Sequence, residues 1–283
     1  MKAKFILFCL FFNFLYPIGL RALVIPQTAS LLSKSGAGVS QSAEVNPALL
    51  ANYRPYVSFS RNSWFGDISG QKISLLLKNK TYISFETLSV ADIELRDEIA
   101  NDSPIGLFGA YWYAIELNRT INLKSSITNK FNIGYKVKMN FSKLYTETMQ
   151  GYTIDFGISN KISKNLSMGL VIKNFGKEYS QHLKANSSPL YGIGSTYNID
   201  NLKIILITDL VYQDQEHSLK FALQTNLSLP LNFILGGTYS ENYRDVSLGI
   251  KLDMKDWTLI YGNLSHDNPI LGNPSSIEIK KYF

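Results

Sequence analysis

The sequence has little cysteine and little charge. Its single cysteine, Cys9, lies in an apolar stretch near the N-terminus, so the rest of the chain has no partner for a disulfide. Charged residues make up 18% of the chain, whereas about 25% is usual in soluble domains. Small secreted domains often need disulfides for stability. This chain must instead rely on its size, on hydrogen bonding or on a membrane.

Motifs for catalysis, cofactors and metals are missing as well. The three histidines, His182, His217 and His266, are far apart and lack the spacing of zinc ligands. Gly192 and Gly194 form a lone glycine pair in an expected strand, with no helix after it to make a phosphate-binding loop. There is no Gly-x-Ser-x-Gly motif, and no histidine has a serine partner in a recognisable hydrolase pattern. We therefore expect no enzyme, no catalytic residue, no cofactor and no metal site.

The charge balance does not favour nucleic acid as a partner. The formal net charge is +6, and three of the positive residues, Lys2, Lys4 and Arg21, stand at the extreme N-terminus. No run of five basic residues occurs anywhere in the chain. Domains that bind nucleic acid instead concentrate lysine and arginine on one surface.

Residues 1–22 have the pattern of a signal peptide. Lys2 and Lys4 precede an almost wholly apolar run from position 5 to 20, and Ala22 fits the last residue of the signal. The alternative is an uncleaved anchor, but the run is shorter than the roughly 20 residues of a spanning helix. No later stretch approaches the ~18 consecutive apolar residues that indicate a transmembrane helix.

The next segment, residues 23–54, is irregular. It is rich in serine, alanine and glycine between positions 33 and 43, and Asn46-Pro47-Ala48 stands near its end. Proline fixes the backbone and lacks an amide donor, which suits a segment that turns inside a wall. An ordinary turn before the first strand is the alternative interpretation.

The remainder, residues 55–283, alternates between apolar and polar residues with a period of two. In the clearest stretch, 131–142, every odd position is apolar and every even position is polar or glycine. Similar stretches follow at 152–159, 166–173, 219–228 and 246–253. Because side chains point alternately to the two faces of a strand, each stretch predicts a strand with one apolar and one polar face.

About fourteen strands can be placed in this way. Their expected centres are Val57, Ile73, Ile83, Trp112, Tyr135, Phe156, Leu170, Ile193, Leu206, Leu223, Leu235, Leu248, Leu259 and Ile279. Bacterial single-chain barrels have an even number of antiparallel strands, and a closed barrel leaves no backbone group unpaired in lipid. The pattern therefore predicts an all-β fold, a transmembrane antiparallel β-barrel. Two tandem soluble β domains are the alternative, and long loops are expected at 91–104 and 176–188.

The polar strand faces carry charges that a barrel would direct into its lumen. Lys136, Lys138 and Asp155 lie on the polar faces of adjacent expected strands, where they could pair or line a pore. A charge on the lipid face would cost about 2–4 kcal/mol at mid-bilayer. We therefore expect Lys136→Leu to insert normally and Val137→Lys to impair assembly.

The C-terminal residues resemble the assembly signal of bacterial outer-membrane barrels. Such barrels often end in an aromatic residue on an alternating strand, and Ile277, Ile279 and Phe283 fit this pattern. Lys281 departs from it, although a lysine near the membrane interface can extend its ammonium group to water. This ending predicts that the outer-membrane assembly machinery is a partner.

Short motifs in a characteristic order complete the pattern. They are Gly36-Ala37-Gly38-Val39, Asn46-Pro47-Ala48-Leu49-Leu50, Tyr56-Val57-Ser58-Phe59-Ser60, Trp64-Phe65-Gly66-Asp67-Ile68-Ser69, Ile154-Asp155-Phe156-Gly157, Leu166-Ser167-Met168-Gly169-Leu170 and Lys173-Asn174-Phe175-Gly176. By these motifs the chain resembles the PorV/PorQ family, which is related to FadL-type transporters. The resemblance implies a fourteen-stranded barrel, residues 55–283, with an N-terminal hatch, residues 23–54, that includes Asn46, Pro47 and Ala48.

The resemblance also implies a function at the bacterial outer membrane, in contact with its lipids. The leading expectation is an accessory of type IX protein secretion that receives secreted cargo proteins, for which the expected loops would be the docking sites. One alternative is a FadL-like channel for hydrophobic small molecules, which requires an apolar lumen and a movable hatch. A structural or adhesive surface barrel is the other alternative.

Overall fold

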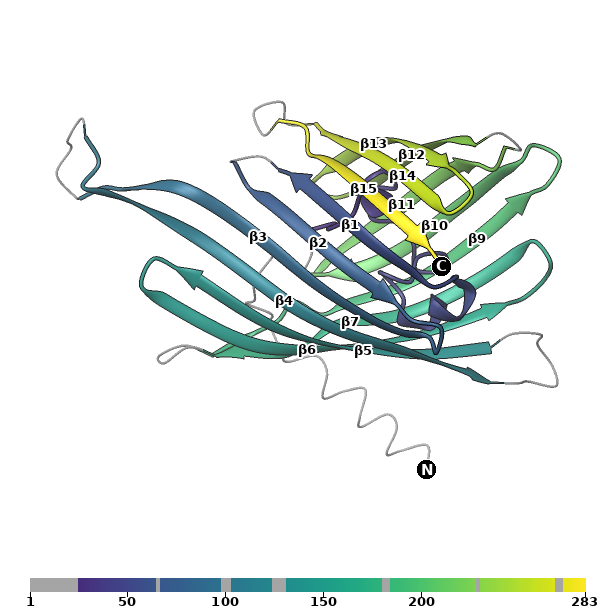
Figure 1. The fold of residues 1–283 in the computed structure, drawn as a ribbon, viewed down its shortest axis with the longest axis horizontal. Coiled ribbons are helices and arrows are strands. Elements are labelled where there is room, and N and C mark those ends of the chain that lie inside the picture. The colour runs from purple at the N-terminus through teal and green to yellow at the C-terminus, as the bar shows by residue number, and fades with distance from the viewer. Residues whose placement is uncertain are drawn as a thin grey trace.

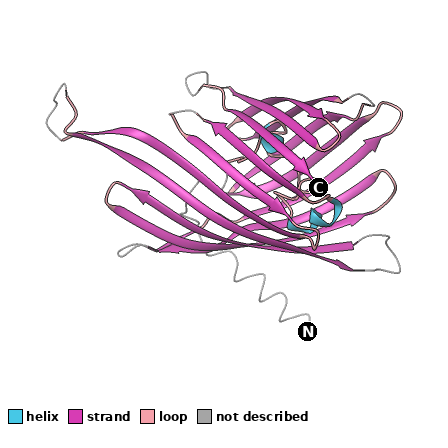
Figure 2. Ribbon diagram, in the orientation of Figure 1, coloured by secondary structure: helices cyan, strands magenta, loops and turns pink. Residues whose placement is uncertain are grey.

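The computed structural model describes residues 25–64, 67–97, 103–123, 131–179, 184–227, 230–267 and 272–283. The expected signal peptide, residues 1–22, lies outside these ranges. The described residues form one closed antiparallel β-barrel with strongly tilted strands (Figure 1). Helix is confined to short pieces enclosed by the strands (Figure 2). No helix in the described ranges is long and apolar enough to cross a membrane.

The elements follow one another as a chain of hairpins after two short helical turns. They are α2 (Ala29–Leu32), η3 (Pro47–Asn52), β1 (Tyr56–Ser63), β2 (Ser69–Leu76), β3 (Thr81–Leu95), β4 (Gly106–Leu123), β5 (Phe131–Leu144), β6 (Glu147–Lys161), β7 (Leu166–Tyr179), β8 (Lys184–Asn186), β9 (Leu190–Ile199), β10 (Ile204–Gln213), β11 (Glu216–Thr225), β12 (Leu231–Ser240), β13 (Arg244–Asp253), β14 (Trp257–His266) and β15 (Ser275–Tyr282).

Neighbouring strands pair in chain order, and the last strand closes the barrel on the first. Phe59 of β1 lies opposite Ile279 of β15. β7 pairs with β9 through Lys173 and then with the three-residue β8 from Lys177 onward. β8 and β9 therefore lie end to end beside β7 and count as one strand of the wall. The described wall thus has fourteen strands. All fourteen expected centres lie in separate strands, so the predicted barrel is confirmed.

The period-two alternation arises because lipid and lumen face opposite sides of the wall. On β5, Val137 and Met139 are 37% and 53% exposed on the outer surface. Lys138 lies between these two residues and Lys136 precedes them. The two lysines are only 7% and 3% exposed, respectively, because they point inward. The same alternation of exposed and buried side chains runs along β1, β2 and β13. The barrel is therefore apolar outside and largely polar inside, as a membrane barrel must be.

Two expected loops are shorter than the sequence indicated. The β3–β4 hairpin continues to Leu95, which pairs with Gly106, so the first part of the expected 91–104 loop is strand. Asp92, with φ of 57°, lies at the register shift in this extension. In the expected 176–188 loop, β7 continues to Tyr179 and pairs with β8. In residues 91–95 and 176–179 the strict alternation that marks the other strands stops before the strands end.

Candidate functional site

The N-terminal residues 25–54, hereafter the lumenal segment, lie inside the barrel. This segment is the purple trace enclosed by the strands in Figure 1. Its helix α2 packs against β13, β14, β15 and β1, and its helix η3 packs against β4, β5 and β6. It therefore bridges opposite sides of the wall and occupies the lumen between them.

Asn46 is the most extensively bonded residue of the lumenal segment. Its side chain is fully buried, and its Oδ1 accepts a hydrogen bond from the Ala48 amide at 3.0 Å, which caps η3. Its Nδ2 donates to the carbonyl of Val39 at 2.8 Å. It also donates to two wall carbonyls, those of Ile158 at 2.9 Å and Leu170 at 3.3 Å. Pro47 then opens the helix, where its missing amide costs nothing.

Glycines on the inner wall allow the lumenal segment to approach the strand backbones. A Cβ added at Gly157 would overlap the amide of Asn46, and one at Gly134 would overlap the backbone joining Pro47 to Ala48. On the opposite side of the wall, three glycines meet the segment around α2 in the same way. These are Gly236 against Lys34, Gly249 against Ser33, and Gly262 against Ala29. The small inner-face residues visible in the sequence thus form a docking track for this segment.

Asp209 of β10 holds the middle of the lumenal segment and was not anticipated from the sequence. It is 1% exposed, and its Oδ2 accepts hydrogen bonds from the backbone amides of Gly38 and Val39 at 2.5 and 2.9 Å. Its carboxylate is the single charge within the apolar strand β10, and that isolation was the available signal. A carboxylate that accepts two backbone amides makes a charge-assisted contact stronger than neutral bonds.

A buried group of charges lines the wall opposite α2. This lumenal ion cluster consists of Lys72, Glu86, Glu116, Lys136, Lys138 and Asp155. The structure brings Lys136 within 3.4 Å of Asp155. Lys138 pairs instead with Glu86 at 2.8 Å and Glu116 at 2.9 Å.

The cluster is balanced and touches the lumenal segment. Three lysines face three carboxylates, so no net charge is buried in it. Lys136 also donates a hydrogen bond to the backbone carbonyl of Glu44 at 2.9 Å. The sequence interpretation missed Lys72, Glu86 and Glu116 because they lie on β2, β3 and β4, whose register could not be read from spacing alone.

The inner wall also carries apolar surface toward the end that is remote from the C-terminus. Leu88 and Trp112 form one buried patch, which contacts Ile25 of the lumenal segment. Val171, Leu190 and Val211 form another, which packs against Val39 and Val45. These patches are apolar exceptions on an inner wall that is otherwise largely polar.

The strand pairing of the wall is irregular beside the second of these patches. Asn174 has φ of 57°, its amide donates to Asp155 Oδ1 at 2.7 Å, and the β6–β7 register shifts at this point. The Ser187 hydroxyl donates to the carbonyls of Asn174 and Gly176 in place of a regular strand ladder. These side-chain bonds satisfy backbone groups that the break would otherwise leave unpaired in a membrane.

The C-terminal strand has the side-chain arrangement expected from its alternation. Ile277, Ile279 and Phe283 are 45%, 42% and 54% exposed on the outer surface. Lys281, the departure from the apolar pattern, places its ammonium group 5.0 Å from the ring centre of Trp257. The assembly role of these residues remains a prediction.

The histidines do not form a site in the described residues. His266 Nδ1 lies 2.6 Å from Asp245 Oδ1, and the centre of the His217 ring lies 4.7 Å from that of Tyr212 with the ring planes tilted by 41°. His182 lies outside the described ranges. No group of three or more His, Cys, Asp or Glu residues in those ranges could hold a metal ion.

Comparison with known proteins identifies the fold but not the family. No protein-family model matches the chain, and no curated protein matches its sequence. Among solved structures, the deltaS2S3 mutant of TodX, a monoaromatic hydrocarbon channel, aligns with a TM-score of 0.65 at 9% identity over 90% of this chain and 99% of that one.

Two further structures align at a similar level. The toluene transporter TbuX of Ralstonia pickettii has a TM-score of 0.61 at 8% identity, over 96% of this chain and 100% of its own. A FadL homologue of Pseudomonas aeruginosa has a TM-score of 0.61 at 8% identity, over 92% and 99%. At these identities the likeness establishes the shared barrel fold alone.

Proposed function

We propose that this protein is a channel for hydrophobic small molecules in the bacterial outer membrane, with the lumenal segment as its movable hatch. The observation that carries the proposal is the combination of an occupied lumen with apolar inner patches around Leu88, Trp112 and Val211. An apolar solute entering the barrel would find a surface that accepts it, whereas a water-filled pore would not offer one.

The way the lumenal segment is attached supports a hatch role for Asn46, Pro47 and Ala48. The segment binds the wall through separate side-chain hydrogen bonds, such as those of Asn46 and Asp209, and not through strand pairing. Each neutral bond contributes only about 0.5–1.5 kcal/mol net, and each bond to the Asp209 carboxylate about 1.5–3 kcal/mol. The segment can therefore be released in steps while the wall, closed by continuous ladders, stays intact.

The likeness to channels for aromatic solutes gives the proposal its ligand class. TodX is described as a monoaromatic hydrocarbon channel and TbuX as a toluene transporter. The outward apolar face would lie in membrane lipid, and the exposed Ile277, Ile279 and Phe283 would serve as the assembly signal. The secretion-accessory role expected from the sequence finds no support among these likenesses.

Uptake by living cells tests the proposal. The native gene is deleted, and entry of radiolabelled toluene is measured in the deletion strain and in the strain complemented with the full chain. We expect slower uptake in the deletion strain and recovery on complementation, because the channel provides the route for the solute. Secreted proteins are quantified by mass spectrometry in the same strains. Normal uptake with defective secretion would contradict the channel and support the export role, and normal results in both assays would leave a structural role.

A further inference from the structure

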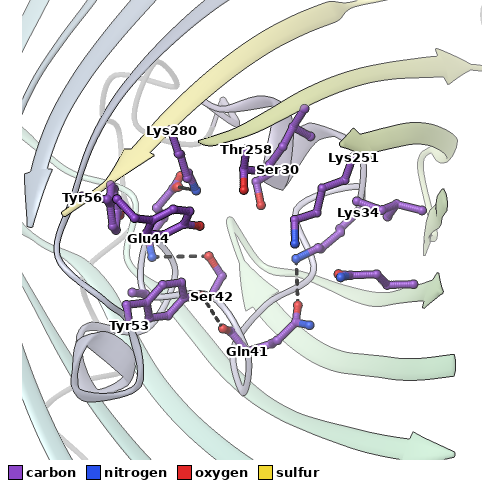
Figure 3. A pocket seen from close by; sticks show the side chains of 15 residues that line it. Ser30, Lys34, Gln41, Ser42, Glu44, Tyr53, Tyr56, Lys251, Thr258 and Lys280 are labelled. Atoms are coloured by element: carbon purple, nitrogen blue, oxygen red, sulfur yellow. Dashed lines mark hydrogen bonds and ion pairs between the residues drawn. The ribbon is translucent and has the colours of Figure 1, made fainter. Parts of the chain in front are cut away.

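A cavity of about 160 Å³ lies between the lumenal segment and the wall, at the barrel end where the C-terminus lies. It is bordered by residues 30–56 on one side and by β11–β15 on the other. Figure 3 shows side chains from both sides converging on this space, with Lys34 and Lys251 on one flank and Tyr53 and Tyr56 on the other. The cavity is separate from the apolar patches around Trp112 and Val211.

Lys34 gives this cavity a positive charge that no carboxylate pairs with directly, although Glu44 lines the same cavity and lies 3.9 Å from Lys280. The residue is 6% exposed, and its Nζ donates to Gln41 Oε1 at 2.7 Å. In the described part of the chain no carboxylate lies within 4.0 Å of this ammonium group. The two neighbouring lysines differ, because Lys280 pairs with Glu278 at 2.8 Å and Lys251 with Asp253 at 2.7 Å.

A buried ammonium group without an anion is unfavourable, which makes its retention informative. Taking such a charge out of water costs several kcal/mol unless an opposite charge or strong hydrogen bonds compensate for it. Gln41 supplies one neutral acceptor for the three N–H donors of Lys34. A bound anion in the cavity would supply the missing compensation, and Lys251, which lines the same cavity while paired with Asp253, would add a further N–H donor.

The opposite flank of the cavity carries the rings of Tyr53, Tyr56 and Tyr282, together with the Glu44 carboxylate and the Lys280 ammonium group. Ile234 and Ile260 are 3% exposed and lie on β12 and β14, the two strands that pair with the strand of Lys251. The hydroxyl of Tyr53 donates to the Gln41 carbonyl at 2.8 Å, so the ring is fixed in place. For scale, an engineered apolar cavity of about 150 Å³ accommodates one benzene ring. The cavity thus has room for a single ring beside its cationic flank.

We propose that this cavity binds a small aromatic carboxylate, with the carboxylate on Lys34 and Lys251 and the ring against Tyr53 and Tyr56. The inference deepens the proposed channel function, since it names a substrate class for the passage out of the lumen. Binding itself can be measured on the purified barrel without transport. A failure of binding is therefore distinguishable from a failure of the channel proposal.

Calorimetric titration of the purified full chain in detergent tests the proposal, with benzoate as the probe. We expect benzoate to bind the wild type and to bind Lys34→Met at least about tenfold more weakly, which corresponds to about 1.4 kcal/mol. Lys34→Arg should retain most of the affinity, because the positive charge remains. Lys164→Met is the matched control, since Lys164 is 89% exposed outside the cavity, and it should bind as the wild type does.

Toluene and inorganic phosphate are titrated into the same proteins. Weaker binding of both than of benzoate supports the proposal, because each lacks one half of the ligand. Toluene binding as tight as benzoate and unchanged in Lys34→Met would overturn the role of charge. Phosphate binding tighter than benzoate would overturn the aromatic part, and no benzoate binding would overturn the whole. If Lys34→Met does not give the heat-modifiable band of a folded barrel, Lys251→Met is used, and unchanged benzoate affinity in that variant also contradicts the proposal.

Discussion

Gly157 of the barrel wall lies so close to Asn46 of the lumenal segment that any side chain at Gly157 would overlap the Asn46 amide. The amide of Asn46 then bonds to the carbonyl of the next residue, Ile158. The wall and the lumenal segment are therefore in direct van der Waals contact at Gly157 and hydrogen-bonded at the next residue. Beyond its chain connection to β1, the segment is therefore held in the lumen by noncovalent contacts.

Substitution of this glycine should loosen the lumenal segment. Gly157→Ala places a methyl group against Asn46, and overpacking of this kind typically costs about 1–3 kcal/mol. We expect faster proteolysis within residues 25–54, followed by mass spectrometry, while the barrel itself stays heat-modifiable. Gly106→Ala is the control, because nothing lies within 4 Å of its added Cβ. Equal protease resistance of both variants would show that the close approach does not hold the segment.

The lumenal ion cluster should respond strongly to the loss of one charge. In the wild type, the ammonium groups of Lys72 and Lys138 lie 3.1 and 2.9 Å from the Glu116 carboxylate. Glu116→Gln removes this negative charge and leaves the two buried positive charges less well balanced. Removing one partner of a buried pair typically costs about 3–5 kcal/mol, which urea unfolding in detergent would detect. The control is Glu94→Gln, whose partner Arg96 is half exposed, and such surface pairs are worth about 0–1 kcal/mol. Similar losses in the two variants would argue against a buried, desolvated cluster.

The direction of the side chains on β5 predicts which charges the membrane tolerates. Val137 faces lipid midway along its strand, so Val137→Lys should impair assembly at a cost of about 2–4 kcal/mol. Lys136→Leu should insert, although it leaves Asp155 without a cation at 3.4 Å and so lowers stability. The fraction of heat-modifiable barrel in the outer membrane measures assembly. Equal assembly of the two variants would contradict the assigned register.

The charge of Lys34 should make stability depend on pH. Burial, together with the nearby Lys280 and Lys251, lowers the pKa of Lys34 from 10.5 to about 8, and Glu44 and Glu278 act in the opposite direction. Between pH 8 and pH 10.5, Lys34 is protonated in the unfolded chain but mostly neutral in the folded protein. The unfolded state therefore binds more protons than the folded state, so the contribution of Lys34 to stability rises with pH in this range. The difference in Tm between Lys34→Met and the wild type should therefore shrink from pH 8 to pH 10.5. A constant difference over this range would contradict a buried Lys34 that no carboxylate pairs with directly.

The barrel could be predicted from the sequence because its main signal is local. Whether residues such as Val137 and Lys136 face lipid or lumen depends only on the alternation along one strand. The hairpins are short and neighbours in sequence are neighbours in space, so the order of strands follows directly. The strand ends near Leu95 and Tyr179 could not be predicted, because the alternation stops there while the backbone pairing continues.

The contacts of the site depend on register and on the path of the lumenal segment, neither of which is a local property. Lys136 and Asp155 could be related because their strands form a clear hairpin, and the structure has them directly opposite each other. Glu116 joins them from β4 only through a register that the sequence leaves open. The bond between Asp209 and Gly38 spans 171 residues, so no spacing rule reveals it.

The central claim is that hydrophobic solutes pass through the lumen when the lumenal segment moves. Ser40 Oγ and Thr196 Oγ1 are 2.6 Å apart, so Ser40→Cys with Thr196→Cys should allow a disulfide between segment and wall. The measurement is toluene uptake by the deletion strain complemented with this double variant, before and after reduction, with each single-cysteine variant as control. We expect the oxidised double variant to lose uptake, reduction to restore it, and the single variants to be unaffected. Uptake at the wild-type rate through a fully cross-linked barrel would contradict a movable hatch.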